Sequence, residues 1–358
     1  MKVLVLTPYL YGTAPGPRSS IELWERVLEP AGISFDYAPF ETERLHEVLY
    51  EPGHTGVKIT EMLRSYARRI PALRDLGRYD AVLVYREAAL IGPAIFERWV
   101  ARKGMPIIYQ LDDPLYVPYR SPSNGYLSYL KFFGKVGKVC EISRVVVVNS
   151  NQHRRYAERF TDSIRQIPSV VDGERFTYEP RVPDAQRPVC IGWSGSSSTA
   201  GNLQVIAGVL RDLGERADVR LHFIGSDRFD LPDVRHTAQP WSADSEVDDL
   251  RRLDIGLLPL PVDEWTKRKF YLKLVQYMAL GIPAVCTPLG SNVDVIDDGV
   301  TGFLADGPAA WREILGRLVE DSQLRAETGR QAADIAHARY TLQANAEAIV
   351  DTFRSAVA

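Results

Sequence analysis

Cysteine is scarce in this chain of 358 residues, which contains only Cys140, Cys190 and Cys286. The three lie far apart in the sequence and show none of the close pairs used by zinc sites and disulfide-rich secreted domains. An odd number of cysteines is typical of a reduced compartment, so we expect a cytoplasmic protein in which Cys286 is a buried thiol. The scarcity therefore excludes a small scaffold held together by disulfides.

Long hydrophobic runs are also lacking. No stretch of the sequence approaches the roughly 20 apolar residues that a membrane-spanning helix requires. The apolar run near the N-terminus, from Met1 to Leu6, is too short and wrongly flanked for a signal peptide. We therefore expect neither a membrane span nor a secretory leader.

Neither sign of charge dominates, since the formal net charge is −3. A balance this close to neutral excludes a broad electrostatic attraction to nucleic acid. No G-x-G-x-x-G sequence follows the first expected strand, which argues against a dinucleotide-dependent oxidoreductase. What is present, 45% apolar and 25% charged residues, is typical of a folded soluble protein, and the length suits two domains.

The first half of the chain alternates short apolar runs with helical segments. Such runs are typical of buried parallel strands. Strands are expected at 3–6, 33–37, 81–85, 106–111 and 144–149, with helices near 19–30, 57–76, 91–103 and 126–142. This βαβ series predicts a doubly wound sheet.

The segment 167–188 interrupts this pattern because it contains several prolines, and we interpret it as the connection between two domains. A second series follows it, with strands expected at 189–193, 219–224, 255–258 and 283–286 and helices near 200–215, 245–252, 271–280 and 308–320. We therefore predict an α/β protein with two doubly wound, Rossmann-like domains. Their expected bounds are 1–180 and 181–340, and a C-terminal helix occupies 341–358.

The stretch 269–304 carries the most specific signature. Lys269, Lys273 and Gln276 follow one another at spacings of four and three, so they share one face of a helix. Gly281 is a natural C-cap for that helix. The loop that follows is rich in glycine and proline and offers backbone N–H groups to an anion at the start of the next helical segment. Together these features predict a site for a phosphorylated ligand.

The residues around this stretch also agree, in order, with a known pattern. The matching positions are Trp265, Lys269, Lys273, Gln276, Tyr277, Met278, Ala279, Gly281, Pro283, Val285, Pro288, Gly290, Asn292, Asp298, Gly299, Gly302, Leu304 and Ala305. This pattern resembles the donor-binding segment of GT-B glycosyltransferases, in particular glycosyltransferase family 4. The chain departs from it where Arg268 replaces a glycine, Ala284 a valine and Asp294 a glutamate.

The resemblance implies a GT-B architecture, in which two Rossmann-like domains face a cleft and the C-terminal helix crosses back to the first domain. It implies a glycosyltransferase that takes a sugar from a nucleotide-diphosphate donor and passes it to a hydroxyl of a glycan, a lipid-linked glycan or a natural product. The donor is a co-substrate, and we expect no cofactor and no bound metal. Relatives of this kind often retain the anomeric configuration.

The resemblance assigns the donor diphosphate to the second domain. Where relatives carry a Gly-Arg pair and a lysine, this chain has Trp193 and Asn202, so basic side chains elsewhere are expected to stabilise the leaving diphosphate. The expected contacts are Ser194, Gly195, Ser196, Ser197, Thr199, Asn202, Arg268, Lys269, Lys273, Gly290, Ser291 and Asn292. The alternative is that the hydroxyl residues only cap a helix.

An E-x7-E motif contacts the donor sugar and the ribose in many relatives, and Arg268 and Gln276 occupy its two ends here. The amide of Gln276 can still hydrogen-bond a diol, so we expect Gln276 to be the ribose ligand. Asp263 or Glu264 could replace the missing first glutamate, although loop carboxylates are more often only solvated. Trp241 is expected to stack on the base, the alternative being a tryptophan with no ligand.

The acceptor side falls in the first domain. Two acidic residues, Asp112 and Asp113, follow the buried strand 106–111, and we predict a catalytic role in orienting the acceptor hydroxyl or stabilising charge on the sugar. The alternative is an Asx cap on the following turn. Glycine loops and basic residues after other strands complete the expected acceptor side: Gly12, Gly16, Arg18 and Arg86.

Basic residues also gather in the segments 57–76 and 126–139, where they accompany apolar side chains. This combination predicts peripheral contact with the inner face of an anionic membrane. An ordinary amphipathic helix with a solvated face is the alternative. The arginines expected on the exposed face of the first segment are Arg64, Arg68, Arg69 and Arg74.

Two other functions remain open from the sequence. A non-catalytic nucleotide-sugar-binding pseudoenzyme is consistent with the loss of the first glutamate to Arg268. Another GT-B chemistry, 2-epimerisation of a UDP-sugar, would need a set of acid and base carboxylates, and Asp112 and Asp113 are the only candidates.

Overall fold

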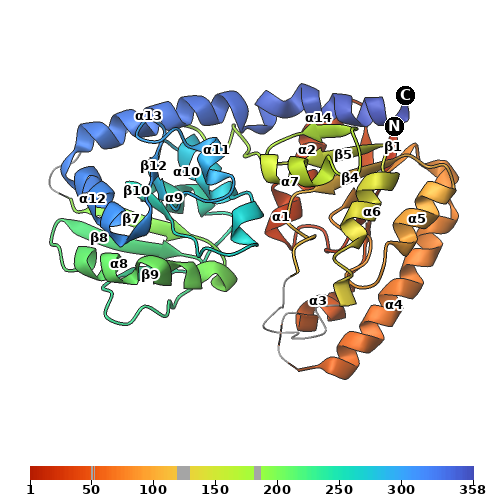
Figure 1. Cartoon of the computed structure of the whole chain (residues 1–358), viewed down its shortest axis with the longest axis horizontal. Coiled ribbons are helices and arrows are strands. Elements are labelled where there is room, and N and C mark those ends of the chain that lie inside the picture. The colour runs from red at the N-terminus through yellow and green to blue at the C-terminus, as the bar shows by residue number, and fades with distance from the viewer. Residues whose placement is uncertain (50, 52, 119–129, 181–186) are drawn as a thin grey trace. The chain divides into compact units, whose positions relative to one another are not determined.

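The computed structural model describes residues 1–49, 51, 53–118, 130–180 and 187–358. The chain divides into two compact units, one of Met1–Ser169 with Asn345–Ala358 and one of Val170–Ala344 (Figure 1). The division lies before residue 180 because Val171 is held by the end of the second unit. Its N–H donates to the Tyr340 carbonyl at 2.9 Å, and its carbonyl accepts from the Leu342 N–H at 2.8 Å.

A six-stranded sheet forms the centre of the first unit, in the order β2-β1-β3-β4-β5-β6, and every pairing is parallel. All side chains of the three strands β3, β4 and β5 are buried, as continuous apolar runs predict for strands covered on both faces. The strands are β1 (Lys2–Thr7), β2 (Ser34–Pro39), β3 (Ala81–Tyr85), β4 (Ile107–Leu111), β5 (Val145–Val148) and β6 (Ile164–Gln166).

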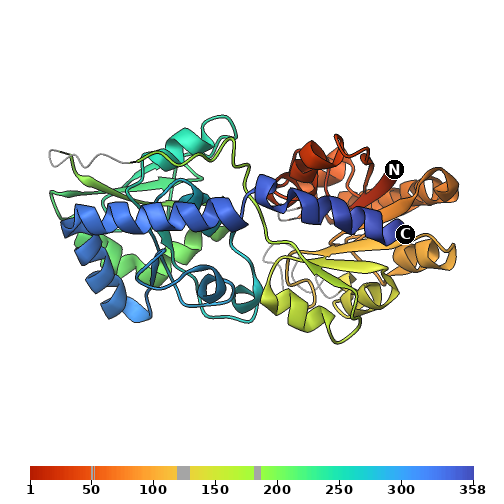
Figure 2. The same cartoon turned by 90° about the horizontal axis from the view of Figure 1, so that it is seen from above.

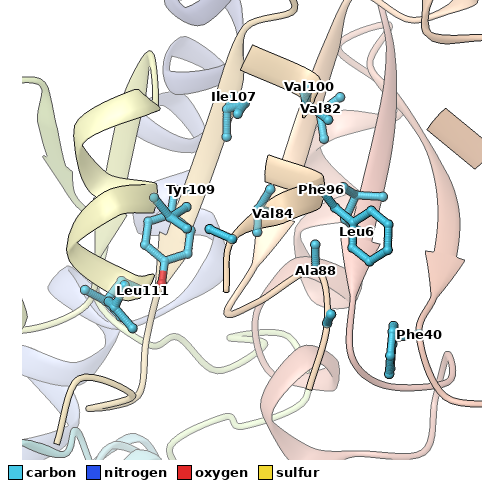
Figure 3. Close-up of a cluster of buried hydrophobic side chains, with 14 of the residues drawn as sticks. Leu6, Phe40, Val82, Val84, Ala88, Phe96, Val100, Ile107, Tyr109 and Leu111 are labelled. Carbon is cyan, nitrogen blue, oxygen red and sulfur yellow. The ribbon is translucent and has the colours of Figure 1, made fainter. Parts of the chain in front are cut away.

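Helices pack against this sheet. They are α1 (Pro15–Arg18), α2 (Ile21–Leu28), α3 (Glu43–Leu49), α4 (Thr55–Arg74), η1 (Leu76–Arg78), α5 (Ile95–Arg102), α6 (Lys135–Ile142), α7 (Asn151–Ala157) and most of α14 (Leu342–Val357). Figure 3 shows part of the core, where Leu6, Val82 and Val84 of the sheet lie near Phe96 and Val100 of α5. Burial of these side chains is the main stabilising contribution in this unit.

The second unit repeats the plan with a parallel sheet in the order β12-β11-β10-β7-β8-β9. Its strands are β7 (Val189–Ser194), β8 (Val219–Ile224), β9 (Thr237–Gln239), β10 (Ile255–Leu258), β11 (Ala284–Cys286) and β12 (Phe303–Leu304). Its helices are η3 (Ser197–Ile206), α8 (Ala207–Gly214), α9 (Glu246–Arg251), η4 (Thr266–Arg268), α10 (Leu272–Ala279), α11 (Asn292–Val295), α12 (Gly307–Glu320) and α13 (Ser322–Arg339). Figure 2 shows the long α13 and α14 following one another at the end of the chain.

Two parallel doubly wound sheets confirm the predicted fold class. The strands missed by the sequence are β6, β9 and β12, which have only two or three residues each and are too short for any periodicity to be visible. The helix expected at 126–142 begins at Lys135 in the described part, and residues 126–129 lie outside the described ranges.

Two basic residues of the segments 57–76 and 126–139 are buried. Arg69 is only 2% exposed because its guanidinium donates to the carbonyls of Ala38, Thr7 and Ala88, which lie at loop and strand ends. Lys135 is likewise buried, and its Nζ lies 2.8 Å from Glu87 Oε2. The prediction of exposure was therefore wrong for Arg69, and Lys135 cannot contribute to a membrane-facing surface.

No helix in the described ranges combines the length and the apolar character needed to cross a bilayer. The three cysteines are free and buried, and Cys286 lies in β11 with no exposed surface, as expected.

Candidate functional site

The loops after β7, β10 and β11 meet at one edge of the second sheet, because these strands are parallel neighbours. The carboxyl edge of such a sheet is where ligands of doubly wound folds bind. Apart from Trp241, which follows β9, the predicted donor residues fall on these loops and on α10, within 194–202, 268–276 and 290–292. The topology therefore brings three separate stretches of sequence to one place.

Lys273, on α10, is the central cation of this site. Its Nζ lies 4.0 Å from the centroid of the Trp193 ring, and Trp193 is fully buried at the end of β7. The same Nζ lies 3.4 Å from Thr199 Oγ1, in η3. A Cβ at Gly195 would collide with both Lys273 Nζ and the Trp193 ring. The bare backbone of Gly195 is therefore what leaves room for the ammonium group.

The charge of Lys273 is poorly compensated. Burial, and in second place the positive charge of Lys269, lowers the pKa of Lys273 to about 7. In the described part of the chain, no carboxylate contributes to this pKa. Contact with the face of an indole ring attracts an ammonium group, but does not supply a counter-ion. A bound anion would favour the charged form of Lys273 and raise its pKa.

The loop after β11 orders the neighbouring lysine. Gly290 has a φ of 57°, and a Cβ there would lie 3.0 Å from the Thr266 carbonyl and 3.1 Å from the Lys267 carbonyl. Ser291 Oγ donates to the Lys269 carbonyl at 3.1 Å. The Asn292 side chain is fully buried and donates to the Thr287 carbonyl at 2.9 Å. The side chains of Ser291 and Asn292 thus hold the loop, and the Asn292 N–H donates to the Leu289 carbonyl at 3.0 Å.

The hydroxyl residues after β7 have differing surroundings. Ser194 is buried, and its N–H donates to the Tyr277 hydroxyl at 2.9 Å. Ser196 caps a turn, since its carbonyl accepts from the Thr199 N–H at 2.9 Å and from Thr199 Oγ1 at 3.0 Å. Asn202 is partly exposed in η3, and only the backbone of Ser197 is described. Capping and ligand binding are compatible for these residues.

Gln276 lies one turn beyond Lys273, and its side chain contacts a carboxylate that the sequence analysis did not identify. Gln276 Nε2 donates to Glu246 Oε1 at 3.1 Å, and Trp241 Nε1 donates to the same oxygen at 3.1 Å. Arg175 Nη1 lies 3.6 Å from Glu246 Oε2. Glu246 opens α9, and only its place five residues after Trp241 could have drawn attention to it. Glu246 therefore links two predicted donor residues, Gln276 and Trp241.

The guanidinium of Arg268 is ion-paired with Glu264. Its Nη1 donates to Glu264 Oε2 at 2.5 Å and to the Glu264 carbonyl at 2.7 Å. Asp263 Oδ1 accepts from the N–H groups of Trp265 and Thr266 at 2.9 and 2.8 Å, so it holds the turn. The two carboxylates considered as substitutes for the missing glutamate are thus both engaged locally.

In the first unit, Arg86 binds both predicted catalytic carboxylates. Its Nε lies 2.6 Å from Asp112 Oδ1, its Nη2 lies 3.1 Å from Asp112 Oδ2, and its Nη1 lies 3.0 Å from Asp113 Oδ2. Burial alone would lower the pKa of Arg86, but the charges of Asp112 and Asp113 raise it well above its usual value. Tyr85 donates its hydroxyl to Asp112 Oδ2 at 2.7 Å. The cluster lies at the carboxyl ends of β3 and β4 and is largely screened from water.

Arg86 is also held in an unusual backbone conformation. Its φ is 61°, in the left-handed region that residues other than glycine seldom adopt and that recurs at functional sites. Gly16 packs on it, because a Cβ at Gly16 would lie 2.8 Å from Arg86 Nη2 and 2.6 Å from the Tyr85 hydroxyl. Tyr9 contributes another contact, with its hydroxyl 3.0 Å from Arg86 Nη1. Gly16, Arg86 and the two aspartates therefore form one cluster.

The other predicted acceptor-side residues lie at the start of the chain. Gly12 has a φ of 73° and donates its N–H to Glu22 Oε1 at 3.0 Å, so turn geometry explains the glycine. Arg18, at the end of α1, is partly exposed, and its charge acts on Glu22. They belong to a glycine loop beside α2.

A buried histidine supports the aspartate loop from behind. Asn149 Nδ2 donates to the Asp112 carbonyl at 3.1 Å, and His153 Nδ1 lies 2.8 Å from Asn149 Oδ1. Burial lowers the pKa of His153 to about 4, although the charges of Asp113 and Asp112 act in the opposite direction. His153 is therefore neutral near neutral pH and positions the loop. The sequence offered no signal for these contacts, which join separate elements.

Residues 189–321 match the family model described as glycosyl transferases group 1. A D-inositol 3-phosphate glycosyltransferase of Paenarthrobacter aurescens is 32% identical over 152 residues, which cover 42% of this chain and 35% of the relative. A protein of the same name from Acidothermus cellulolyticus is 24% identical over 327 residues, covering 81% of this chain and 70% of the relative. The chain thus spans about a third of the length of the first relative. The resemblance predicted from the stretch 269–304 is confirmed for the second unit.

Solved structures show the same fold over the whole length. A sucrose-phosphate synthase from Thermosynechococcus elongatus has a TM-score of 0.74 and 13% identity, covering 99% of this chain and 98% of that chain. HepE of Anabaena, solved in complex with UDP, has a TM-score of 0.70 and 16% identity, covering 99% of this chain and 100% of that chain. Another structure of HepE contains UDP-glucose. These likenesses confirm the GT-B fold.

Proposed function

We propose that this chain is a glycosyltransferase that moves a sugar from a nucleotide-diphosphate donor to an acceptor hydroxyl. The observation that carries the proposal is the environment of Lys273, which lies against Trp193 and near Lys269, while no carboxylate among the described residues offsets its charge. A diphosphate would supply the missing negative charge. The match of residues 189–321 to glycosyl transferases group 1 supports the same reading.

The chemistry that follows is electrostatic. When the bond between the sugar and the diphosphate breaks, negative charge grows on the leaving diphosphate. Lys273 and Lys269 stand ready to stabilise that charge, and fixed cations of this kind lower the barrier because they need no reorganisation. The backbone N–H groups of Gly290 and Ser291, in the loop after β11, add to the same effect. We propose that transfer retains the anomeric configuration and requires no bound metal or other cofactor.

The acceptor belongs to the first unit in this proposal. The cluster of Arg86, Asp112 and Asp113 is largely screened from water and contains fixed charges and hydroxyl groups. Because Asp112 is bound by two guanidinium nitrogens, it serves to hold Arg86. Asp113, which Arg86 Nη1 contacts at 3.0 Å, is the candidate for orienting an acceptor hydroxyl of a glycan, a lipid-linked glycan or a natural product.

A non-catalytic nucleotide-sugar binder is the alternative that one observation favours. Arg268 stands where the resemblance expects a glutamate near the donor sugar, and it pairs with Glu264. A binder needs the diphosphate site alone. The other alternative, 2-epimerisation of a UDP-sugar, gains no support, because both candidate carboxylates are ion-paired with Arg86.

The test is a thermal-shift screen of nucleotide-diphosphate sugars followed by a hydrolysis and transfer assay on those that bind. We expect one donor to raise the melting temperature by mass action and to be hydrolysed slowly or transferred. Binding without any turnover would indicate a non-catalytic binder and not a glycosyltransferase. Failure of every donor to bind would reject the proposal.

We also propose peripheral contact of α4 with an anionic membrane. The large apolar side chains Ile59, Leu63 and Ile70 are exposed at spacings of four and seven, which place them on one helix face. Arg64, Arg68 and Arg74 are exposed on the same helix, and Arg64 is ion-paired at 2.8 Å with Glu61, the buried acidic residue of α4. An apolar stripe flanked by cations is the surface that an anionic bilayer binds.

A further inference from the structure

Glu246 is a carboxylate with a fixed position beside the predicted ribose ligand. Gln276 Nε2 and Trp241 Nε1 both donate to its Oε1 at 3.1 Å, and Arg175 Nη1 lies 3.6 Å from its Oε2. These partners come from three separate segments of the second unit. The side chain of Glu246 is nevertheless 15% exposed, so a ligand can reach it.

The two carboxylate oxygens are not equally occupied. Oε1 already accepts two hydrogen bonds, which is about what its lone pairs allow. Oε2 faces Arg175 at a distance too long for a hydrogen bond, and the Arg175 side chain is 39% exposed. Oε2 therefore retains the capacity to accept hydroxyl groups from a ligand.

The position of Glu246 also agrees with that of the diphosphate site. Lys273 and Gln276 are three residues apart on α10, so they share a helix face, and Glu246 contacts the second of them. A nucleotide with its diphosphate at Lys273 would bring its ribose to Gln276 and Glu246. The N–H of Trp241 donates to Glu246, and Trp241 is 37% exposed. A base could therefore stack on its ring.

We propose that Glu246 is the carboxylate that accepts hydrogen bonds from the ribose 2′- and 3′-hydroxyls, and that Gln276 orients it. This inference rests on the proposed use of a nucleotide-diphosphate donor. Relatives with the E-x7-E motif carry a glutamate at the position of Gln276, where this chain has an amide. In this chain the carboxylate of the pair lies on α9 and the amide on α10. The site should prefer ribonucleotides to deoxyribonucleotides.

The experiment measures that preference by calorimetry. UDP, GDP and ADP and their 2′-deoxy counterparts are titrated into the full chain and into the variants Glu246→Gln, Glu246→Gln with Gln276→Glu, and Asp248→Asn. The double variant has the carboxylate on α10 and the amide on α9, the reverse of the parent chain. Asp248→Asn removes an exposed acidic residue from the same helix α9 and is the matched control. Thermal unfolding of each variant checks that it is folded.

We expect the parent chain and Asp248→Asn to bind one ribonucleotide roughly tenfold or more tightly than its 2′-deoxy form, as hydrogen bonds to a charged group require. Glu246→Gln should reduce the preference below about threefold, and the double variant should restore it. A purely structural role for Glu246 would weaken both nucleotides equally and leave the ratio unchanged. An unchanged ratio in folded Glu246→Gln overturns this inference alone, whereas a parent chain that binds no nucleoside diphosphate overturns the proposed function as well.

Discussion

The ammonium group of Lys273 lies 4.0 Å from the centre of the Trp193 indole ring. The two residues come from α10 and from the end of β7, 80 positions apart in the sequence. The resemblance expects a Gly-Arg pair where Trp193 stands, so this chain has an aromatic platform for a lysine in place of a second fixed cation. The binding of an anion here depends on how well that platform holds Lys273.

Lys273→Ala should remove most of the affinity for a nucleoside diphosphate. Loss of one partner of a desolvated charge pair weakens binding by about 30-fold or more. Calorimetry with the nucleotide found in the donor screen measures the change. Lys267→Ala, which removes an exposed lysine paired with Glu264, is the control and should bind as the parent does. Equal affinity in Lys273→Ala would place the diphosphate elsewhere.

Diphosphate binding should depend on pH above about 7. The pKa of Lys273 is lowered to about 7 in the free protein, so most of the protein carries a neutral amine at higher pH. A bound diphosphate raises that pKa, and binding therefore takes up a proton. The affinity should fall by up to about tenfold per pH unit as the pH rises above 7, until the pKa of the complex is reached. Calorimetry in buffers of different ionisation enthalpy measures the uptake, and binding without proton uptake at about pH 8.5 would contradict the low pKa.

Gly195→Ala should impair donor binding. The added methyl group would push against Lys273 Nζ and the Trp193 ring, and the flexible lysine can move away more easily than the buried indole. The affinity for a nucleoside diphosphate should fall by roughly tenfold, which corresponds to about 1.4 kcal/mol. Gly201→Ala is the matched control, because a Cβ there meets no atom within 4 Å. If both variants bind equally well, Gly195 is only a turn residue.

Asp112→Asn should destabilise the first unit. The buried guanidinium of Arg86 would lose half of its carboxylate partners, and breaking a buried ion pair costs about 3 kcal/mol. Chemical denaturation followed by a probe in the first unit measures this loss. Asp75→Asn, at an exposed position, should change the free energy of unfolding by less than about 0.5 kcal/mol. A variant Asp112→Asn that is fully stable but inactive would restore the catalytic role predicted from the sequence.

Leu63→Glu should weaken binding to anionic vesicles. The Leu63 side chain is 67% exposed on α4, so the substitution leaves the core intact while it removes an apolar contact and adds repulsion. Together these effects should lower vesicle affinity by about tenfold or more. Co-sedimentation with vesicles that contain phosphatidylserine is the measurement. Val262→Glu changes an exposed apolar residue of the second unit and should have no effect; equal loss in both variants would argue against a specific role for α4.

Much of the fold could be predicted because its causes are local. Strands such as β3 and β5 are continuous apolar runs, and Gly281 and Pro283 end a helix by their own backbone geometry. The same holds for the shared face of Lys273 and Gln276, which follows from helical spacing alone. The prediction that Arg69 is exposed was wrong because its guanidinium donates to carbonyl groups of distant loops and strand ends. The spacing of residues on α4 cannot reveal such partners.

The candidate site was predictable in its members but not in its pairings. Arg86 and Asp112 were assigned separately to the acceptor side and to catalysis, and the structure joins them in one buried ion pair. Glu246 was not assigned at all, because its significance lies in the contact with Gln276 across 30 positions of sequence. Charge compensation between residues far apart in the chain becomes visible only when both positions are known.

From the sequence alone, two doubly wound halves, the phosphate-binding character of the stretch 269–304 and its family resemblance could be derived. These depend on hydrophobic periodicity, backbone stereochemistry and a fixed order of residues, all of which act over a few positions. The tertiary structure decided which charges are neutralised: Arg86 is bound by two aspartates, whereas Lys273 lies against an indole ring, and no carboxylate in the part of the chain that the structure describes offsets its charge. The physical reason is that desolvation and ion pairing depend on distances between side chains from different elements, and folding sets those distances.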